Sequence, residues 1–423
     1  MTVARVDGAE ADSNGTGGVL IVGGGQAAVQ LAISLRELGW QAPITIASEE
    51  PHAPYQRPPL SKAFLAGSAD VAVHEFRTPD FYEGERITLL TSHRVTEVRR
   101  AAHGKPGVAT TDGGESLEFG HLALATGARP RSLAVPGVGL AGVCYLRDVT
   151  HAVGLRERLA AARRVLVVGG GFIGLEVAAA ATARGKEVTL VEATERLIGR
   201  VVAPVVSDFY RVAHERRGVR VILRAAVSRF EGEDGAVTGA HLSAGSFIPA
   251  DLVVIGVGAV PRTELAENLG LTCDGGIIVD SFARTSDPAI VAAGDCAVTP
   301  HPAAGDGGLV RLESVGHAID HAKIAAATLA GAPVPYDAVP WFWSDQGTLK
   351  LKIAGLSAGF DQTVMRGDPQ QERFSVLYYR TGRLLAVHAV NSPRDYMAVR
   401  RALTAGQEIL PEDAANPDKP LNL

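Results

Sequence analysis

Two glycine-rich stretches of the chain have the residue types and spacing that bind a dinucleotide pyrophosphate. They are Gly23-x-Gly25-x-x-Ala28 and Gly169-x-Gly171-x-x-Gly174. The first glycine of such a motif permits a tight turn, and the second lets a pyrophosphate approach bare backbone. The third position, which also tolerates alanine, lets a helix pack on the strand, with its positive dipole end toward the phosphates. The sequence therefore predicts two dinucleotide sites.

Carboxylates downstream of each motif are placed to recognise the adenosine end of a dinucleotide. Glu192 lies 23 residues after Gly169, at the end of the run EVTLVE, where an acid accepts both ribose hydroxyls. After the first motif, the run PITIASEE delivers Glu49 or Glu50 to the same position. A carboxylate at Glu192 repels a 2′-phosphate, so we expect NADH to be preferred over NADPH, a preference that Arg196 or Arg200 could soften if either turns toward that phosphate.

A third carboxylate, Asp295, follows the apolar strand of IVAAGDCAV, where it could bind the ribityl hydroxyls of FAD. An oxidoreductase with two dinucleotide sites most simply holds one dinucleotide and exchanges the other. A tightly held flavin beside a diffusing nicotinamide works in this way. The expected cofactors are therefore FAD, at the first glycine motif, and NAD, at the second.

Strand–turn–helix units must position these motifs. The β-branched runs VLIV and VLVV read as buried parallel strands, and the pattern from residue 172 to 184 reads as a helix. LALATGARPR, IVAAGDCAV and VVIGVGAVPRTELA supply further strands that end in small residues. Because Asp295 comes about 270 residues after the first motif, we expect a discontinuous FAD-binding domain with the nicotinamide domain inserted in it.

Composition excludes several other classes of protein. The net charge of −5, from 41 basic and 46 acidic residues, argues against nucleic-acid binding. No apolar run reaches the roughly 18 residues of a membrane span, and the polar residues 1–18 read as a disordered tail without a signal peptide. The three cysteines, Cys144, Cys273 and Cys296, are far apart, which fits a reducing cytoplasm and excludes a local redox disulfide.

Five longer motifs carry a resemblance to a known family. They are PYQRPPLSKAFLAG, GGGFIGLEVAAAA, RTSDPAIVAAGDCA, VRLESVGHAIDHAKIAA and PWFWSDQ. From about Val19 to about Arg401 the chain resembles the FAD-dependent NADH:ferredoxin reductases of bacterial oxygenase systems, of the putidaredoxin reductase and biphenyl-dioxygenase reductase type. The resemblance implies hydride transfer from NADH to the flavin N5, then single-electron transfer to a [2Fe–2S] ferredoxin that serves a cytochrome P450 or Rieske oxygenase. No metal site in this chain is implied.

The resemblance also implies the fold. We expect an α/β protein with two Rossmann-like dinucleotide-binding domains, glutathione-reductase-like in arrangement, and a small C-terminal α+β domain. The expected domains are a FAD-binding domain (19–140 and 263–339), a NAD-binding domain (141–262) and a C-terminal reductase domain (340–423). The sequence supports the last independently, because TLKLKIAGL, FSVLYYR and RLLAVHAV alternate as antiparallel strands and SPRDYMAVRRALTAG reads as a closing helix. We also expect one helix from GLVRLESVG to Gly331, and a loose tail from residue 411.

Site residues follow from the resemblance by position. Lys62 would lie near the flavin N5 and pair with Glu176, and this pair would orient the isoalloxazine edge and tie two domains together. Trp343 would shield one face of the flavin, and Phe172 would cover the nicotinamide pocket until the coenzyme displaces it. Val315 would begin a helix whose N-terminus stabilises the negative charge of reduced flavin. The other expected contacts are Ala27, Glu49, Arg57, Val95 (adenine), Thr126 and Arg129 (pyrophosphate) for FAD, and Ile173, Arg200 and Gly258 for NAD.

The expected partners are NADH and an acidic ferredoxin, with the protein itself a monomer or weak dimer. Since the net charge is negative, positive charge should concentrate near the flavin, with Lys323 and Lys352 as candidates for ferredoxin docking. Three alternatives share the fold. A disulfide reductase needs a cysteine in EEPHAPYQRPPLSKAF, which has none. A rubredoxin or nitrite reductase subunit differs only in its acceptor. A nicotinamide-sensing flavoprotein of the apoptosis-inducing-factor type would bind a partner instead of turning over with ferredoxin.

Overall fold

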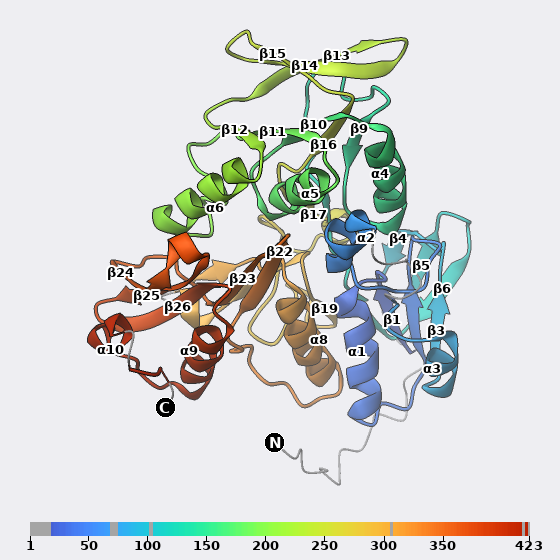
Figure 1. Ribbon diagram of the computed structural model, residues 1–423. Coiled ribbons are helices and arrows are strands. Elements are labelled where there is room, and N and C mark those ends of the chain that lie inside the picture. Colours follow the sequence, from blue (N-terminus) through green and yellow to red (C-terminus); the bar gives the residue numbers. More distant parts are fainter. Residues whose placement is uncertain (1–17, 68–74, 101–104, 305–307, 417–418, 422–423) are drawn as a thin grey trace.

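A computed structural model describes residues 18–67, 75–100, 105–304, 308–416 and 419–421. The expected disordered tail thus lies almost wholly outside the described residues. Three five-stranded sheets dominate the described part, two of them parallel and one antiparallel. In Figure 1 the second parallel sheet lies above the other two, which sit side by side. The predicted α/β fold class is confirmed.

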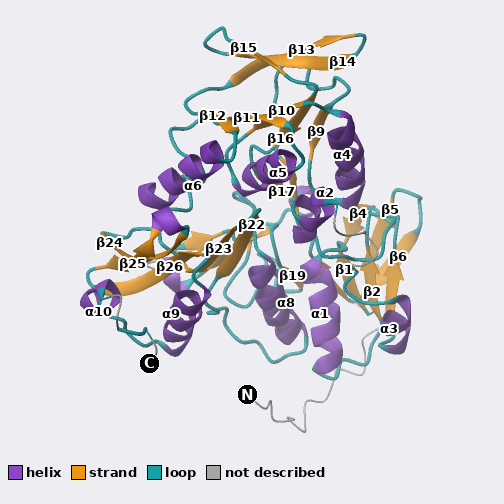
Figure 2. Ribbon diagram, in the orientation of Figure 1, coloured by secondary structure: helices purple, strands orange, loops and turns teal. Residues whose placement is uncertain are grey.

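The first parallel sheet carries the first glycine motif. Its strands in order are β19 (Ile290–Ala292), β7 (His121–Leu124), β1 (Val19–Val22), β2 (Ile44–Ala47) and β3 (Ile87–Leu90). Helices α1 (Gln26–Glu37) and α8 (Val315–Leu329) pack against each other on this sheet through a seam of small alanines (Figure 2). Since β19 comes after the whole second sheet in the chain, this unit is discontinuous.

The second parallel sheet carries the second glycine motif. Its strands in order are β12 (Val219–Ile222), β11 (Glu187–Val191), β10 (Arg164–Val168), β16 (Leu252–Ile255) and β9 (Val143–Tyr145). Helices α4 (Val149–Ala161), α5 (Phe172–Ala183) and α6 (Pro204–Arg216) belong to this unit. The strands β10 and β16 are almost continuously apolar, as expected of parallel strands covered on both faces.

The C-terminal sheet is antiparallel. Its strands in order are β22 (Trp341–Gln346), β23 (Leu349–Gly355), β26 (Arg383–Val390), β25 (Arg373–Arg380) and β24 (Gln362–Asp368). Helix α9 (Pro393–Ala405) packs on it. Helix α5, from the unit built on the second parallel sheet (the nucleotide unit below), contacts its edge strand β22. The three predicted strands and the closing helix are all present.

Two expectations about this region are wrong. The helix expected from GLVRLESVG begins only at Val315, because Ser314 caps it by accepting a hydrogen bond from the His317 amide. The preceding residues form the short strand β21 (Leu309–Val310). The described part of the tail is not loose either, because α10 (Pro411–Ala415) and Lys419 are held by Arg366, which donates to the carbonyls of Ala414 and Lys419.

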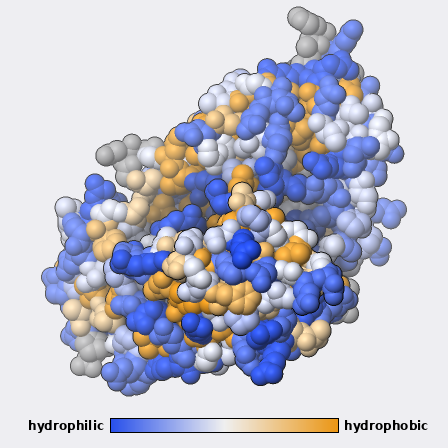
Figure 3. Space-filling view, turned by 90° about the horizontal axis from the view of Figure 1, so that it is seen from above, coloured by the Kyte–Doolittle hydropathy of each residue, from blue (hydrophilic) through white to orange (hydrophobic). Residues whose placement is uncertain are grey.

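Smaller elements complete the units. They are β4 (Val95–Arg99), β5 (Gly107–Thr111), β6 (Ser116–Phe119), β13 (Val227–Glu233), β14 (Ala236–Leu242), β15 (Phe247–Pro249), the pair β8 (Ala128–Pro130) and β17 (Ala259–Pro261), and the turn η1 (Pro58–Ser61) with α2 (Ala63–Ala66). Seen from above, hydrophilic side chains and hydrophobic patches are interspersed on the surface (Figure 3).

Within the described ranges, every helix is too short or too polar to cross a bilayer.

Candidate functional site: a shared dinucleotide cavity

A cavity of about 900 Å³ lies where the three units meet. Its wall includes the second glycine motif, the start of α5, the η1 turn, the start of α8 and the edge strand β22. Fourteen of the predicted site residues line it. They are Ala27, Arg57, Lys62, Gly169, Gly171, Phe172, Ile173, Glu176, Glu192, Arg200, Gly258, Asp295, Val315 and Trp343.

The glycines of the two motifs have the geometry that a bound pyrophosphate requires. Gly23 has φ +126°, and a Cβ there would lie 2.1 Å from the Ala125 carbonyl oxygen, so only glycine fits this turn. At Gly174 a Cβ would lie 2.0 Å from the Gly169 carbonyl oxygen, because helix and strand pack closely. A Cβ on Gly25, by contrast, would meet no atom within 4 Å. The motif therefore leaves open space at the position where a pyrophosphate approaches the backbone.

Glu176 is the point at which all three units touch one side chain. It belongs to α5 and is 2% exposed. Lys62 Nζ lies 2.9 Å from Glu176 Oε2, and Ser61 of the η1 turn donates to the same oxygen. Ser344 of β22 donates to Glu176 Oε1 over 2.6 Å. The expected pairing of Lys62 with Glu176 is present, and the two serines add partners that were not expected.

Glu192 lies beside the second glycine motif, as its spacing predicts. Its Oε2 accepts a hydrogen bond from the Gly170 amide over 2.6 Å, and its Oε1 accepts one from the Thr194 amide over 2.7 Å. These two bonds fix the carboxylate at the end of β11, on the cavity wall. Arg200 lies on the same wall.

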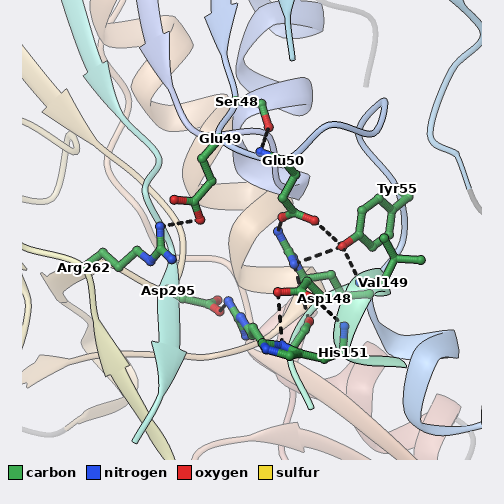
Figure 4. Close-up of polar contacts among 11 residues, drawn as sticks. Ser48, Glu49, Glu50, Tyr55, Asp148, Val149, His151, Arg262 and Asp295 are labelled. Carbon is green, nitrogen blue, oxygen red and sulfur yellow. Dashed lines mark hydrogen bonds and ion pairs between the residues drawn. The ribbon is translucent and has the colours of Figure 1, made fainter. Parts of the chain in front are cut away.

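Glu49 and Glu50 turn in different directions (Figure 4). Glu49 pairs with Arg262, whose Nη1 lies 2.5 Å from Glu49 Oε1. Glu50 accepts hydrogen bonds from Tyr55 and Arg57, and the Tyr55 hydroxyl also accepts one from the Val149 amide. Glu50 therefore connects the first unit to α4 of the second, and it is Glu49 that stays free of this cluster.

Asp295 and the start of α8 lie together at the first unit's end of the cavity. Asp295 Oδ2 is 3.1 Å from Arg147 Nη2. Burial lowers the pKa of His317, in the first turn of α8, to about 4, although the charge of Asp295 acts in the opposite direction. The α8 N-terminus beside Val315 therefore carries its dipole charge with a neutral imidazole behind it.

Aromatic side chains close the cavity from two sides. Trp343 lines it and stacks on Trp341 with ring centroids 5.6 Å apart and planes 19° apart. Phe172, the first residue of α5, packs against Phe342 with centroids 4.6 Å apart. Phe172 and Trp343 are both half-buried.

Eight predicted site residues lie outside the cavity wall. Arg129 forms an ion pair with Glu264 on the surface, and Thr126 donates to the Arg262 carbonyl. Val95 is buried at the start of β4, and Glu49 is held by Arg262 as described. The others are the motif residues Gly23, Gly25, Ala28 and Gly174, which act through backbone shape.

Three polar residues at the site were missed by the sequence analysis. Ser61 and Ser344 stood inside quoted motifs, RPPLSK and PWFWSDQ, but a serine next to a better candidate carries no spacing signal of its own. Arg147 comes from a segment without a motif, and only the fold brings it to Asp295.

Family models match almost the whole chain. Residues 17–322 match the pyridine nucleotide-disulphide oxidoreductase model, and residues 341–423 match the reductase C-terminal model. The chain belongs to the pyridine nucleotide-disulphide oxidoreductase family. It is an oxidoreductase, and the cofactors of its family are FAD and NAD(H). The open turn at Gly25 and the fixed carboxylate of Glu192 fit these two dinucleotides.

Several of the similar proteins in this oxidoreductase family are ferredoxin reductases, and rubredoxin-NAD(+) reductases are also among them. Rhodocoxin reductase of Rhodococcus erythropolis is 44% identical over 405 residues, which cover 96% of this chain and 93% of that protein. The crystal structure of the ferredoxin reductase for the CYP199A2 system from Rhodopseudomonas palustris superposes with a TM-score of 0.92 at 42% identity, covering 96% and 99%. The reductase in the covalent putidaredoxin reductase–putidaredoxin complex superposes with a TM-score of 0.91 at 40% identity, covering 96% and 97%. The predicted resemblance is confirmed.

The three cysteines, Cys144, Cys273 and Cys296, are free thiols in the described structure, and none of them lines the cavity. Burial raises the pKa of the Cys296 thiol, which favours its protonated form.

Proposed function

We propose that this protein passes electrons from NADH through FAD to a [2Fe–2S] ferredoxin that serves a cytochrome P450 or Rieske oxygenase. The observation that carries this proposal is the single cavity in which the second glycine motif, Asp295, the α8 N-terminus and Trp343 converge. When bound, FAD supplies the chemistry that converts the electron pair of a hydride into two single-electron transfers.

Each side chain at the cavity then has a role in binding or orientation. Glu192 binds the ribose hydroxyls of NADH, and Asp295, held by Arg147, binds the ribityl chain. Lys62 holds the flavin edge while Glu176 fixes its ammonium group in place. The α8 N-terminus stabilises negative charge that develops on the flavin during turnover. Trp343 excludes water from one face of the ring.

The domain division also remains a proposal. It assigns residues 19–140 and 263–339 to FAD, 141–262 to NAD and 340–423 to the C-terminal reductase domain. Glu49 and Thr126 would contact FAD, Val95 would lie at its adenine and Arg129 at its pyrophosphate. Three free cysteines support a reducing compartment, so we expect the protein to act in the cytoplasm. We expect a monomer or weak dimer.

The test begins with the purified protein. It should be yellow, with one FAD per chain, and denaturation should release FAD rather than FMN because the first motif accommodates a pyrophosphate. NADH should reduce a [2Fe–2S] ferredoxin through this protein, measured by the loss of ferredoxin absorbance without oxygen. A colourless protein that FAD does not reconstitute would refute the proposal, and faster turnover with rubredoxin would identify the other acceptor class.

A further inference from the structure

A buried row of polar side chains leads from the cavity into the C-terminal sheet and then back into the nucleotide unit. Beyond the pair of Lys62 and Glu176, Ser344 Oγ lies 2.6 Å from Glu176 Oε1. Gln346 Nε2 donates to Ser344 Oγ over 3.3 Å, and Gln346 Oε1 lies 2.8 Å from His214 Nε2. Together these contacts form one continuous path from Lys62 to α6.

Every member of this row beyond the lysine is shielded from water. Ser344 is 0% exposed, and Gln346 and His214 are each 1% exposed. Buried polar groups that lose one partner cannot replace it with solvent, so each bond in the row constrains the next.

The donors in the row all point the same way. Gln346 Oε1 can only accept, so His214 Nε2 carries the proton of that bond. Burial lowers the pKa of His214, which keeps the imidazole neutral with its proton on this nitrogen. Gln346 then donates to Ser344, and Ser344 donates to Glu176. Hydrogen bonds aligned in this way polarise one another and strengthen the last of them, the bond that Ser344 donates to Glu176.

We propose that Ser344 is a positioning residue, held by Gln346 and His214, that fixes the Glu176 carboxyl group against Lys62. This inference rests on the proposed function, because it concerns how the lysine is held at the flavin edge. The family models treat the C-terminal segment as a separate domain, yet one of its strands, β22, supplies the donor. Electron uptake from NADH in the first two units therefore depends on correct docking of the third.

Ser344→Ala is the primary test, measured on the FAD-loaded protein. Flavin reduction by saturating NADH in an anaerobic stopped-flow instrument should slow by about tenfold, the scale of one lost hydrogen bond to a charged group. The Kd for NADH should stay within about twofold of the parent value, because Glu192 and the glycine motif are untouched. Ser344→Thr, which retains the hydroxyl, should restore the rate to within about threefold of the parent.

Gln346→Leu tests whether the row acts as a unit. It should slow flavin reduction by about threefold, and combining it with Ser344→Ala should slow the reaction no further than Ser344→Ala alone. Hydrogen exchange supplies a readout that is independent of turnover. Amides of residues 341–346 and of α5 should exchange faster in both single variants.

Ser375→Ala is the matched control. Ser375 is also 0% exposed, also lies in the C-terminal sheet, and also donates to a carboxylate, Asp395 Oδ2, over 2.9 Å. It does not contact the row, so its loss should leave the flavin reduction rate and the exchange of β22 as in the parent. If Ser344→Ala does not fold, Ser344→Cys replaces it as the test, because this side chain keeps a similar size and is only a weak hydrogen-bond donor.

The outcomes separate this inference from the proposed function. If NADH does not reduce the flavin of the parent protein, the proposed function fails. If the parent is reduced and Ser344→Ala matches it in rate and exchange, the positioning role of Ser344 is wrong. Additive effects of Ser344→Ala and Gln346→Leu, or equal slowing by Ser375→Ala, would also overturn it.

Discussion

At the scale of single residues, the carboxylates of this protein are sorted by what holds them. Glu192 accepts hydrogen bonds from two backbone amides and faces the cavity. Glu176 is buried among two serines and a lysine. Glu50 accepts hydrogen bonds from Tyr55 and Arg57. Only a carboxylate with spare acceptor capacity at the cavity surface can bind ribose hydroxyls. This distinguishes the binding role that we propose for Glu192 from the structural role of Glu50.

The first prediction concerns coenzyme choice at Glu192. The parent should prefer NADH over NADPH by roughly a hundredfold in kcat/KM, because a partly desolvated carboxylate repels a 2′-phosphate by a few kcal/mol. Glu192→Ala should reduce this ratio to about tenfold or less. Glu195→Ala is the control, since Glu195 also lines the cavity but is 62% exposed and paired with Arg224. An unchanged ratio in Glu192→Ala would remove its assigned role.

At the scale of elements, the strand–turn–helix units were predictable and the polar partners between them were not. The runs before Gly23 and Gly169 gave β1 and β10, and the helix expected from residue 172 to 184 is α5, Phe172–Ala183. These patterns are local, because periodicity and turn chemistry act within a few residues. Ser344 reaches Glu176 across 168 positions, and such a contact depends on how whole units dock.

The same difference between local patterns and contacts from distant segments explains two wrong predictions, the start of α8 and the loose tail. The expected helix before Gly331 was extended too far because VRLES is compatible with a helix in isolation. The Ser314 cap decides the start, and its role emerges only when strand β21 pairs with β20 (Ala297–Pro300). The tail was expected to be loose, but Arg366 of β24 donates hydrogen bonds to the backbone carbonyls of Ala414 and Lys419.

The second prediction tests the turn of the first glycine motif. Gly25→Ala should fold like the parent, because its Cβ would meet no protein atom within 4 Å, yet it should bind FAD at least about tenfold more weakly. The pyrophosphate occupies that open space in our proposal. FAD content after purification and the Kd from titration of the apoprotein measure this effect.

Substitutions at two other glycines serve as comparisons for Gly25→Ala. Gly23→Ala should fail to give folded protein, because a Cβ would collide with the Ala125 carbonyl oxygen and φ is +126°. Gly154→Ala, in α4 and also with open space around its Cβ, should keep the FAD content of the parent. Full FAD affinity in Gly25→Ala would place the pyrophosphate elsewhere.

At the scale of the whole molecule, stability should depend on pH through buried histidines. Burial lowers the pKa of His317 to about 4 and that of His388 to about 3, and it lowers the pKa of His321 as well. In the unfolded chain these groups titrate near 6.5, so the unfolded state binds more protons as the pH falls below that value. The native state is therefore stable above pH 6.5 and loses stability between pH 6.5 and about 4.

The third prediction follows from this loss of stability as the pH falls. The free energy of unfolding from chemical denaturation should fall by roughly 3 kcal/mol per pH unit near pH 5 from His317 and His388 alone. His321→Leu should make the decline shallower, because it removes one of the buried groups that take up a proton on unfolding. The substitution breaks no hydrogen bond, since neither ring nitrogen of His321 has a partner. A free energy of unfolding that stays constant from pH 7 to pH 5 would contradict the neutral state of these side chains.

The last prediction concerns the docking face for ferredoxin, which must lie where electrons leave the cavity. Trp343 lines the cavity and stacks on Trp341, and the Arg400 guanidinium lies 4.9 Å from the Trp341 ring centroid. Lys352, half-buried on β23, is the cross-strand neighbour of Trp343, and Lys323 is exposed on α8, which contacts β22. Positive side chains therefore lie on the elements next to the aromatic end of the cavity, in a chain of net charge −5.

Charges of this kind mainly set the rate of encounter with an acidic partner, so ferredoxin reduction should slow as salt shortens the Debye length. Reduction of a small uncharged acceptor should barely change. The double variant Lys323→Glu and Lys352→Glu should raise the KM for ferredoxin by about tenfold at low salt and leave flavin reduction by NADH intact. Charge reversal at Arg163 and Arg220, two arginines on the nucleotide unit outside the cavity wall, is the control and should leave that KM unchanged. If the lysine variant reduces its ferredoxin as well as the parent does at low salt, the partner docks on another face and electrons leave by a route that bypasses Trp343.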